Sequence, residues 1–342
     1  MGHRYGAVQW NGQKRAYDGW LLAGLGLFLA GFIGASLLGP APEARVSPVI
    51  LVIRALGVAA FLMLTLILCI GPAARLDRRF LPFLYNRRHF GVLTFLVALG
   101  HAVLVLAWYH GGGLLNPLVS VLVINPRTDA FIGFPFELLG IAALAILFLM
   151  AATSHDFWLA QLGPTAWKTL HMLVYVAYGL IVLHIGLGAL QDEVAPLYAG
   201  LTLAAVLLVS GLHLAAGLRA RPRVAGKAPG AEGWVVAGPL AAIADKRAIV
   251  VTPPRGEAIA VFRDGERVMA VSNLCAHQMG PLGEGRIIDG CITCPWHGYQ
   301  YDPCTGRAPA PFTERIATYR VRVEDGQVLV HPEPVPAGEA RP

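Results

Sequence analysis

The chain has 342 residues, of which 56% are apolar and only 14% are charged, well below the roughly 25% charge of a soluble globular domain. Residues 1–230 carry 16 basic and 8 acidic residues, whereas residues 231–342 carry 11 and 13, so the net charge of +6 comes from the first part. This composition excludes a wholly soluble protein, and because no basic tract is interleaved with aromatic residues it also excludes a nucleic-acid partner.

Six apolar blocks between residues 20 and 218 predict membrane-spanning helices. Each has about 20 residues, enough to cross a hydrocarbon layer of about 30 Å. Residues 1–19 are polar and predict a cytoplasmic N-terminal segment without the pattern of a cleavable signal peptide. Pro40, Pro72 and Pro196 fall in the predicted connections, where they interrupt no helix. The predicted helices are Trp20–Leu38, Val49–Ile70, Phe90–Tyr109, Phe134–Ala152, Trp167–Leu190 and Leu197–Leu218.

The basic residues of the connections predict the orientation of these helices. Thirteen Lys and Arg residues fall on the side of the two termini, and two fall on the other side. Because basic connections tend to stay in the cytoplasm, we expect both termini to be cytoplasmic. The predicted protein is therefore a multi-pass protein of a bacterial-type inner membrane, in contact with membrane lipid.

After the last apolar block the sequence predicts a second, small all-β domain. Residues 219–231 are rich in Arg, Pro and Gly, which is typical of a linker. Within residues 232–333, alternating apolar segments are joined by Asp-Gly pairs, which indicate hairpins. A tail follows over residues 334–342. The predicted hairpin strands are Ala258–Phe262 with Val268–Val271, across Asp264-Gly265, and Tyr319–Val323 with Val328–Val330, across Asp325-Gly326.

Two Cys-His pairs in the predicted β domain indicate a metal centre. Cys275 and His277 are followed, after 16 residues, by Cys294 and His297. In one type of two-iron, two-sulfur cluster, two thiolates bind one iron and two imidazoles bind the other. The same donors would also suit a single zinc ion, and spacing alone leaves that alternative open.

The residues around these donors resemble the ligand loops of Rieske ferredoxins and of the Rieske domains of oxygenases. The stretches NLCAHQMGPLGEG and CPWHGYQYDPCTGRA carry the resemblance, which covers about residues 232–331. It implies a [2Fe-2S] cluster with Cys275, His277, Cys294 and His297 as its metal ligands. We also expect Gly298 to be needed for a close backbone approach in the second loop.

A difference from the respiratory Rieske proteins predicts the redox potential. Those proteins have a disulfide between the positions that match Met279 and Trp296, and a serine at the position of Tyr299 that hydrogen-bonds a cluster sulfur. This chain has neither. We therefore expect a potential of about −150 mV, at the low end of the range for such clusters. The missing disulfide also fits a reducing cytoplasm.

Histidines within the apolar blocks predict haem, because ionisable groups in a bilayer usually mark function and imidazole is a common haem ligand. His171 and His184 lie about 20 Å apart along one predicted helix, and His89 and His101 lie about 18 Å apart along another. They could form two pairs at different depths of the membrane, His89 with His171 and His101 with His184, and each pair could bind a b-type haem. A membrane histidine can equally be a hydrogen-bonded packing residue, and His213 competes with His89 as the partner of His171.

Two of the blocks, RRHFGVLTFLVALGHAVL and WKTLHMLVYVAYGLIVLH, resemble helices of the ferric reductase-like transmembrane family. The similarity is greatest to the haem membrane subunit of methionine-sulfoxide reductase systems, and it covers about residues 50–218. It implies that His101, His171 and His184 are haem ligands. His89 has no clear counterpart in the family, so the haem count, one or two, stays open.

Motifs that are missing narrow the predicted function. No Gly-x-Gly-x-x-Gly follows a predicted strand, so we expect no nucleotide-binding domain, and no two-His, one-carboxylate set suits the iron of an oxygenase. We predict an electron carrier rather than a complete enzyme. It would pass electrons between the cytoplasmic cluster and haem b, towards or from a quinone or periplasmic acceptor, with a cytoplasmic protein as electron donor or acceptor. The alternative is a membrane-anchored redox sensor or docking module without haem-mediated transfer. Structural or interfacial roles are expected for Cys69, Cys291, Cys304, His110 and His155.

Overall fold

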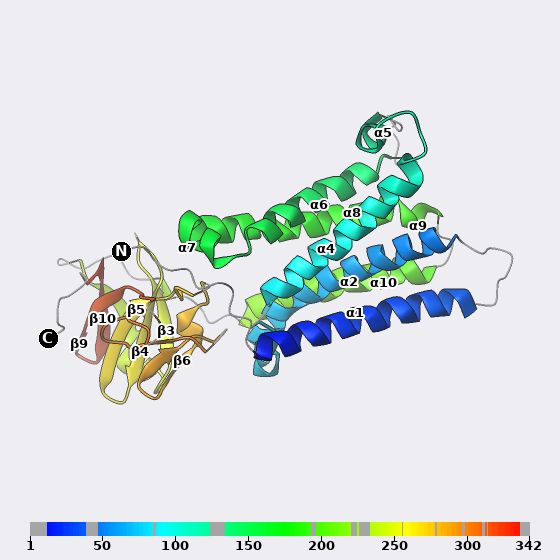
Figure 1. The fold of residues 1–342 in the computed structure, drawn as a ribbon. Helices are drawn as coiled ribbons and strands as arrows, with labels where there is room; N and C mark the ends of the chain where they lie inside the picture. Colours follow the sequence, from blue (N-terminus) through cyan, green and yellow to red (C-terminus); the bar gives the residue numbers. More distant parts are fainter. Residues whose placement is uncertain are drawn as a thin grey trace. The chain divides into compact units, whose positions relative to one another are not determined.

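The computed structural model divides into two compact units (Figure 1). The first comprises Met1–Arg75 and Asn86–Ala216, and the second comprises Leu76–Tyr85 and Gly217–Pro342. Most of the predicted linker and tail lies outside the described residues. The structure describes residues 12–38, 47–84, 87–123, 134–192, 196–219, 224–225, 233–254, 256–277, 279–295, 298–309, 312 and 314–335.

The first unit is helical, and its described part contains five helical segments long and apolar enough to cross a membrane. The predicted fourth span is present only as a shorter apolar helix of 16 residues, α6. The predicted number of six spanning helices is therefore not exact. The spanning segments are Arg15–Leu38, Pro48–Leu76, Arg87–His110, Ala166–Gln191 and Pro196–Arg219. The α-helices of the chain are α1 Gly12–Leu38, α2 Pro48–Leu76, α3 Leu81–Leu84, α4 Arg87–Val105, α5 Pro117–Val123, α6 Glu137–Ala152, α7 Asp156–His171, α8 Val174–Leu187, α9 Ala189–Asp192 and α10 Pro196–Arg219, of which α3 belongs to the second unit.

Two of these helices differ from the sequence prediction. α2 continues through Pro72 instead of ending before it. Proline removes only one backbone donor, and packing in apolar surroundings lets a helix continue past it. The predicted fifth helix is divided into α7 and α8 by a turn at Met172 and Leu173. There the N–H of Met172 donates to the carbonyls of both Lys168 (2.9 Å) and Thr169 (3.2 Å), a tightening common at helix ends.

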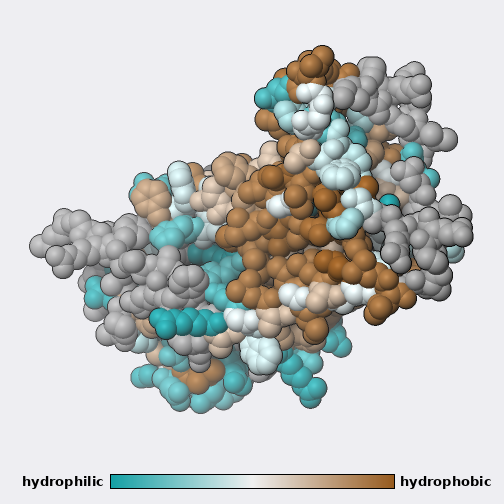
Figure 2. Space-filling model, turned by 45° about the vertical axis from the view of Figure 1, so that its right-hand side comes forward, coloured by the Kyte–Doolittle hydropathy of each residue, from teal (hydrophilic) through white to brown (hydrophobic). Residues whose placement is uncertain are grey.

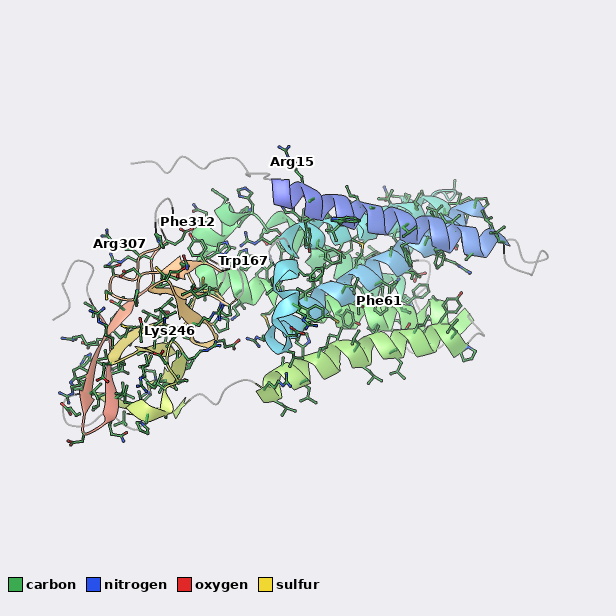
Figure 3. The ribbon with its side chains drawn as sticks, turned by 90° about the horizontal axis from the view of Figure 1, so that it is seen from below. Arg15, Phe61, Trp167, Lys246, Arg307 and Phe312 are labelled. Carbon is green, nitrogen blue, oxygen red and sulfur yellow. The ribbon has the colours of Figure 1, made fainter. Side chains whose placement is uncertain are left out.

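Side chains from α2, α4, α6, α8 and α10 fill the interior of the helical unit. Phe61 stacks on Tyr178 with ring centroids 5.8 Å apart, and Figure 3 shows Phe61 among the side chains between the helices. Other apolar residues face outward: Leu27 is 77% and Leu207 is 61% exposed. Figure 2 shows the resulting apolar surface over the helical part. A surface of this kind fits contact with lipid rather than water.

The second unit contains the predicted all-β domain, which has two sheets (Figure 1). The larger sheet has the order β1-β3-β4-β5-β9-β10-β2, and the smaller has the order β6-β7-β8. All neighbouring strands are antiparallel except the pair β1–β3. The strands are β1 Val224–Ala225, β2 Val235–Pro239, β3 Ala248–Thr252, β4 Ile259–Asp264, β5 Arg267–Ser272, β6 Arg286–Ile288, β7 Cys291–Thr293, β8 Gln300–Tyr301, β9 Thr318–Glu324 and β10 Gln327–Pro334.

Both predicted hairpins are confirmed. β9 and β10 pair across Asp325 and Gly326, whose φ angles of 48° and 72° are those that a two-residue hairpin turn of type I′ requires. β4 and β5 also pair as a hairpin, but Asp264 still belongs to β4. The turn residues are Gly265 and Glu266, one position later than the Asp-Gly pair indicated.

Strand β4 is buried on both of its faces. Ile259 and Val261 pack in one hydrophobic layer, and Ala260 and Phe262 pack in the other. All four are fully buried, because alternate residues of a strand point to opposite faces. The Phe262 layer also contains side chains of β6, β7 and β8. This layer therefore joins the large sheet to the small sheet. The first predicted cluster loop lies between β5 and β6, and the second lies between β7 and β8.

Candidate metal centres

The two predicted cluster loops share the same pair of backbone hydrogen bonds. In each, the N–H of the cysteine donates to the carbonyl five residues later, and the N–H four residues later donates to the carbonyl of the cysteine. Each cysteine thus begins a closed turn of its own. The four bonds are Cys275 N to Gly280 O (2.9 Å), Met279 N to Cys275 O (2.8 Å), Cys294 N to Tyr299 O (2.8 Å) and Gly298 N to Cys294 O (3.1 Å).

The fourth residue after each cysteine has a positive φ angle. Gly298 has φ +69° in the second loop, and Met279 has φ +60° at the equivalent place in the first. A Cβ on Gly298 would meet no described atom within 4 Å, so the expected close backbone approach stays a prediction. Glycine suits this position because of its backbone angle, which other residues adopt only with strain.

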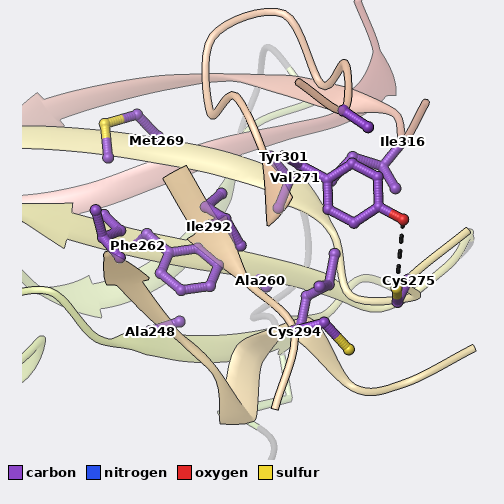
Figure 4. Packing of buried hydrophobic residues seen from close by; sticks show 13 residues of the cluster. Ala248, Ala260, Phe262, Met269, Val271, Cys275, Ile292, Cys294, Tyr301 and Ile316 are labelled. Carbon is purple, nitrogen blue, oxygen red and sulfur yellow. Dashed lines mark hydrogen bonds between the residues drawn. The ribbon is translucent and has the colours of Figure 1, made fainter. Parts of the chain in front are cut away.

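Both predicted ligand cysteines are buried at one end of the Phe262 layer (Figure 4). Cys275 is 1% and Cys294 is 2% exposed, and all five cysteines of the chain are free. The hydroxyl of Tyr301 lies 3.3 Å from Cys275 Sγ. Burial, and next the charge of Cys275, raise the pKa of Tyr301, so its hydroxyl stays protonated. Since a thiolate sulfur can only accept, Tyr301 is the donor to it.

His277 is held by an aromatic and acidic neighbourhood. Its ring stacks on Tyr299, with centroids 4.9 Å apart and planes 10° apart. The Tyr299 hydroxyl donates to the carboxylate of Glu314, and Phe312 packs on the Tyr299 ring at 5.0 Å. Burial, and next Glu314, raise the pKa of Tyr299. The hydroxyl of Tyr299 therefore stays protonated and keeps its bond to Glu314.

A two-iron cluster and a single zinc ion place different demands on the four predicted donors. His297 lies outside the described residues. Among the residues that the structure does describe, no three His, Cys, Asp or Glu side chains converge where a single ion could bind. A zinc ion would draw its ligands to one point, whereas a two-iron cluster divides thiolates and imidazoles between two irons. Cys275, Cys294 and His277 supply both thiolates and one of the two imidazoles that such a cluster requires.

In the helical unit, the imidazoles of His101 on α4 and His184 on α8 are held in the same way. Nδ1 of His101 lies 2.9 Å from the carbonyl oxygen of Ile53, and Nδ1 of His184 lies 2.9 Å from that of Phe136. A carbonyl only accepts, so each proton resides on Nδ1 and each Nε2 keeps the lone pair that iron requires. Their helices, α4 and α8, both pack against α6.

His171 lies beside Trp167 and a basic residue. The two rings stack with centroids 3.8 Å apart, and Nδ1 of His171 lies 3.0 Å from the Trp167 carbonyl oxygen. The guanidinium of Arg88 lies over the ring of Trp167, 5.1 Å from its centroid, in a cation–π contact. Nε2 of His171 is buried without a hydrogen bond to any described residue, although the backbone of Met150 is nearby.

His89 does not share the environment of His101. Its Nδ1 lies 2.9 Å and 3.1 Å from the two carboxylate oxygens of Asp18 on α1. His89 and His101 both belong to α4, where 12 residues at 3.6 per turn place them about 120° apart around the axis. The structure thus directs His101 towards α2 and His89 towards α1.

The other membrane histidines make local contacts. Nδ1 of His213 lies 2.9 Å from the Val209 carbonyl oxygen, and its Nε2 lies 2.9 Å from the Tyr175 hydroxyl. With both nitrogens engaged, His213 is poorly placed to pair with His171. The predicted structural role of Cys69 is confirmed, because it packs in the helical core. The last two contacts are His110 Nδ1 to Ser120 Oγ (2.9 Å) and Phe157 N–H to His155 Nδ1 (3.1 Å), which caps α7.

Comparison with known proteins assigns each part of the chain to a family. Residues 233–320 match the Rieske [2Fe-2S] domain, and residues 56–182 match the ferric reductase like transmembrane component. The chain is 47% identical over 75 residues to the anthranilate 1,2-dioxygenase ferredoxin subunit of Burkholderia cepacia. The matched region is 21% of this chain and 68% of that protein. It is 31% identical over 171 residues to the protein-methionine-sulfoxide reductase heme-binding subunit MsrQ of Caulobacter vibrioides. That matched region is 50% of this chain and 76% of that protein. The chain belongs to both families.

The family assignments predicted from the sequence are thereby confirmed. The Rieske domain is also 34% identical, over 100 residues, to the ferredoxin component of the naphthalene 1,2-dioxygenase system of Pseudomonas aeruginosa, which covers 29% of this chain and 95% of that one. The relatives of the Rieske domain are thus ferredoxin subunits, and MsrQ, a relative of the ferric reductase-like domain, is a heme-binding subunit. Both similarities indicate that the chain is a multi-pass membrane protein that takes part in electron transfer.

Five residues that border the candidate sites were not identified from the sequence: Tyr301, Glu314, Asp18, and also Gly57 and Gly140, which lie against the rings of His101 and His184. Tyr301 had a usable signal, because a tyrosine so close after Cys294 must end near the ligand loops. Asp18 had a weaker one, as an acid at the edge of an apolar block. Glu314 and the two glycines carry no local signal, because their contacts come from distant parts of the chain.

Proposed function

We propose that this chain is a membrane-bound electron-transfer protein. Single electrons would pass between a [2Fe-2S] cluster in the Rieske domain and b-type haem in the ferric reductase-like domain, towards or from a quinone or periplasmic acceptor. One observation carries the proposal: a single chain combines the two closed cysteine turns of a cluster with two imidazoles that both keep Nε2 available. Its relatives, ferredoxin subunits and a heme-binding subunit, support the same combination.

In the Rieske domain, Cys275 and Cys294 would supply the thiolates, and His277 and His297 the imidazoles. A bound cluster accepts and releases one electron at a time. Tyr301 donates a hydrogen bond to the Cys275 sulfur and so stabilises negative charge there. Burial of both cysteines keeps water from these sulfurs.

In the transmembrane domain, His101 and His184 are the residues that would bind one haem b through Nε2. The carbonyls of Ile53 and Phe136 fix each ring and increase the basicity of Nε2, as outer partners of metal-bound histidines do. His171 is the proposed ligand of a second haem, because its Nε2 is buried and without a hydrogen bond to any residue described by the structure. That His89 completes this second site stays a prediction.

We also propose the orientation and the partners. The excess of basic residues on the side of the termini favours a bacterial-type inner membrane with both termini, and hence the Rieske domain, in the cytoplasm. A cytoplasmic reductase would then be the electron donor, since a low-potential cluster passes electrons on readily. We propose the domain division predicted from the sequence, with a membrane domain over 20–218, a linker to 231 and the Rieske domain over 232–333. Within this division α1 begins earlier, at Gly12, and β1, Val224–Ala225, falls in the predicted linker.

The proposal is tested on the full chain purified from membranes in mild detergent. We expect two non-haem irons per chain, no stoichiometric zinc, a rhombic electron paramagnetic resonance (EPR) signal after reduction, and a b-type optical spectrum. His101→Ala and His184→Ala should each reduce the haem content while the EPR signal of the cluster persists. Because the variants change only the membrane part, the cluster signal serves as the internal control for folding.

Two outcomes would refute the proposal. Zinc in place of iron would remove the cluster. Iron with no haem after mild extraction would instead favour a membrane-anchored redox sensor. Direction of transfer is then measured by mixing the reduced protein with a soluble quinone and following reoxidation of the cluster and haem separately. Reoxidation of neither would contradict the proposed acceptor.

A further inference from the structure

Two glycines contact the imidazoles of the proposed haem ligands directly. A Cβ built on Gly57 would lie 3.0 Å from both Cε1 and Nδ1 of His101. A Cβ built on Gly140 would lie 3.0 Å from Cε1 and Nδ1 of His184 and 3.5 Å from Nε2. Each ring therefore lies against bare helix backbone, on α2 for His101 and on α6 for His184.

Each of these glycines comes four residues after the carbonyl that binds the ring. Gly57 follows Ile53, and Gly140 follows Phe136. In a helix the residue at i+4 lies directly above residue i on the same face, so its side chain covers the carbonyl oxygen of residue i. A glycine leaves that oxygen open to a second donor. The Phe136 oxygen shows this, because it accepts from the backbone N–H groups of Leu139 (3.1 Å) and Gly140 (3.3 Å) and also from His184 Nδ1.

We infer that Gly57 and Gly140 are positioning residues for haem, since each exposes a helix carbonyl and provides the surface on which an iron-binding imidazole lies. This inference rests on the proposed function, in which His101 and His184 bind haem. The two arrangements occur on different helices with the same spacing and the same ring atoms in contact. Two independent parts of the chain thus hold the two rings in one geometry.

Contact with an imidazole is not a general property of the glycines in these helices. Gly91 on α4, Gly179 on α8 and Gly211 on α10 would each place a Cβ with nothing within 4 Å. Alanine at these positions adds the same methyl group and changes helix propensity by the same amount. Gly91→Ala and Gly211→Ala are therefore matched controls for Gly57→Ala and Gly140→Ala.

A methyl group at either contact glycine would force the ring to move by a few tenths of an ångström, because 3.0 Å is shorter than an ordinary carbon contact. The movement would weaken the Nδ1 bond to the carbonyl and change the orientation of the ring. Loss of an outer partner of this kind lowers metal affinity by about 10- to 100-fold. We expect a loss of haem affinity in this range.

The experiment uses the full-length chain in detergent with the four single variants. It measures the haem-to-protein ratio, the rate of haem transfer to apomyoglobin, and the g-values of low-spin ferric haem, which report ring orientation. We expect Gly57→Ala and Gly140→Ala to release haem about 10- to 100-fold faster and to shift the g-values. The two control variants should match the wild type, and the Rieske EPR signal should be unchanged in all four.

Three results would overturn the inference. The first is that g-values and haem release in the contact variants equal those of the wild type, and the second is that the control variants release haem as fast as the contact variants. The third is loss of the cluster signal together with haem in both contact variants, which would indicate general misfolding. Failure of the proposed function is distinguishable, because His101→Ala and His184→Ala would then leave the haem content unchanged. If those two variants lose haem while the contact variants behave as controls, only the inference fails.

Discussion

Replacement of Tyr301 by phenylalanine removes one hydroxyl from the cluster site and leaves the ring in place. The hydroxyl lies 3.3 Å from Cys275 Sγ, and Tyr301 is fully buried. A ligand sulfur carries more negative charge after reduction, so the hydrogen bond is stronger in the reduced state. Its loss should therefore lower the redox potential.

The size of the shift follows from the strength of the bond. A hydrogen bond to a charged acceptor contributes about 1.5–3 kcal/mol, and we take about 1–2 kcal/mol as the part that depends on reduction. A one-electron couple changes by 59 mV for each tenfold change in its equilibrium constant, or about 1.4 kcal/mol. Tyr301→Phe should therefore lower the potential by about 40–90 mV.

The assay is an EPR-monitored redox titration of the full-length protein. Tyr319→Phe is the matched control, because Tyr319 is also buried and its hydroxyl donates to Glu257 at 2.5 Å, but it belongs to the other hydrophobic layer. The control should keep the wild-type potential. An unchanged potential in Tyr301→Phe, or an equal shift in both variants, would refute the reasoning.

Three further predictions test other parts of the structure. His89→Ala should leave one haem per chain, because His89 binds Asp18 on a different face of α4 from the proposed haem; a haem-free variant by optical spectroscopy would contradict this. Gly298→Ala should lower the free energy of unfolding by about 1–2 kcal/mol, because its φ of +69° strains alanine. Met279→Gly should change it by no more than about 0.5 kcal/mol, since relief of strain is offset by added chain entropy; urea unfolding that reverses this order would count against the shared loop geometry. Burial, and next its bond to a carboxylate, raise the pKa of Tyr319. Above pH about 10 the unfolded tyrosine ionises first, so stability should fall with rising pH. The decline should be shallower in Tyr319→Phe, and equal slopes would contradict the assignment.

The sequence was sufficient for the features that depend on local pattern. Apolar blocks of membrane length indicated the helices, and Asp325-Gly326 between alternating segments indicated a hairpin that the structure confirms. Where the expectation was wrong, long-range packing decided. Pro72 lies inside α2 because the neighbouring helices support the continued helix, and α6 is shorter than a full span.

The candidate sites show the same division. The spacing of the cysteine and histidine residues indicated which donors to expect, since ligand chemistry is written in residue types. The surroundings of those donors were not accessible. The prediction of a low potential counted a missing serine and a missing disulfide, but it did not count Tyr301, whose bond to Cys275 raises the potential. Nor could any local pattern link Gly57 with His101, because their contact joins two separate helices.

The central place of β4 makes the Rieske domain a single cooperative body. Ile259 and Val261 belong to one hydrophobic layer and Ala260 and Phe262 to the other, so neither layer can open while the strand stays in place. The amide hydrogens of β4 would then exchange with deuterium only through global unfolding. A substitution that destabilises the hydrophobic layer of Ile259 and Val261 would therefore also destabilise, through β4, the layer that contains Cys275 and Cys294.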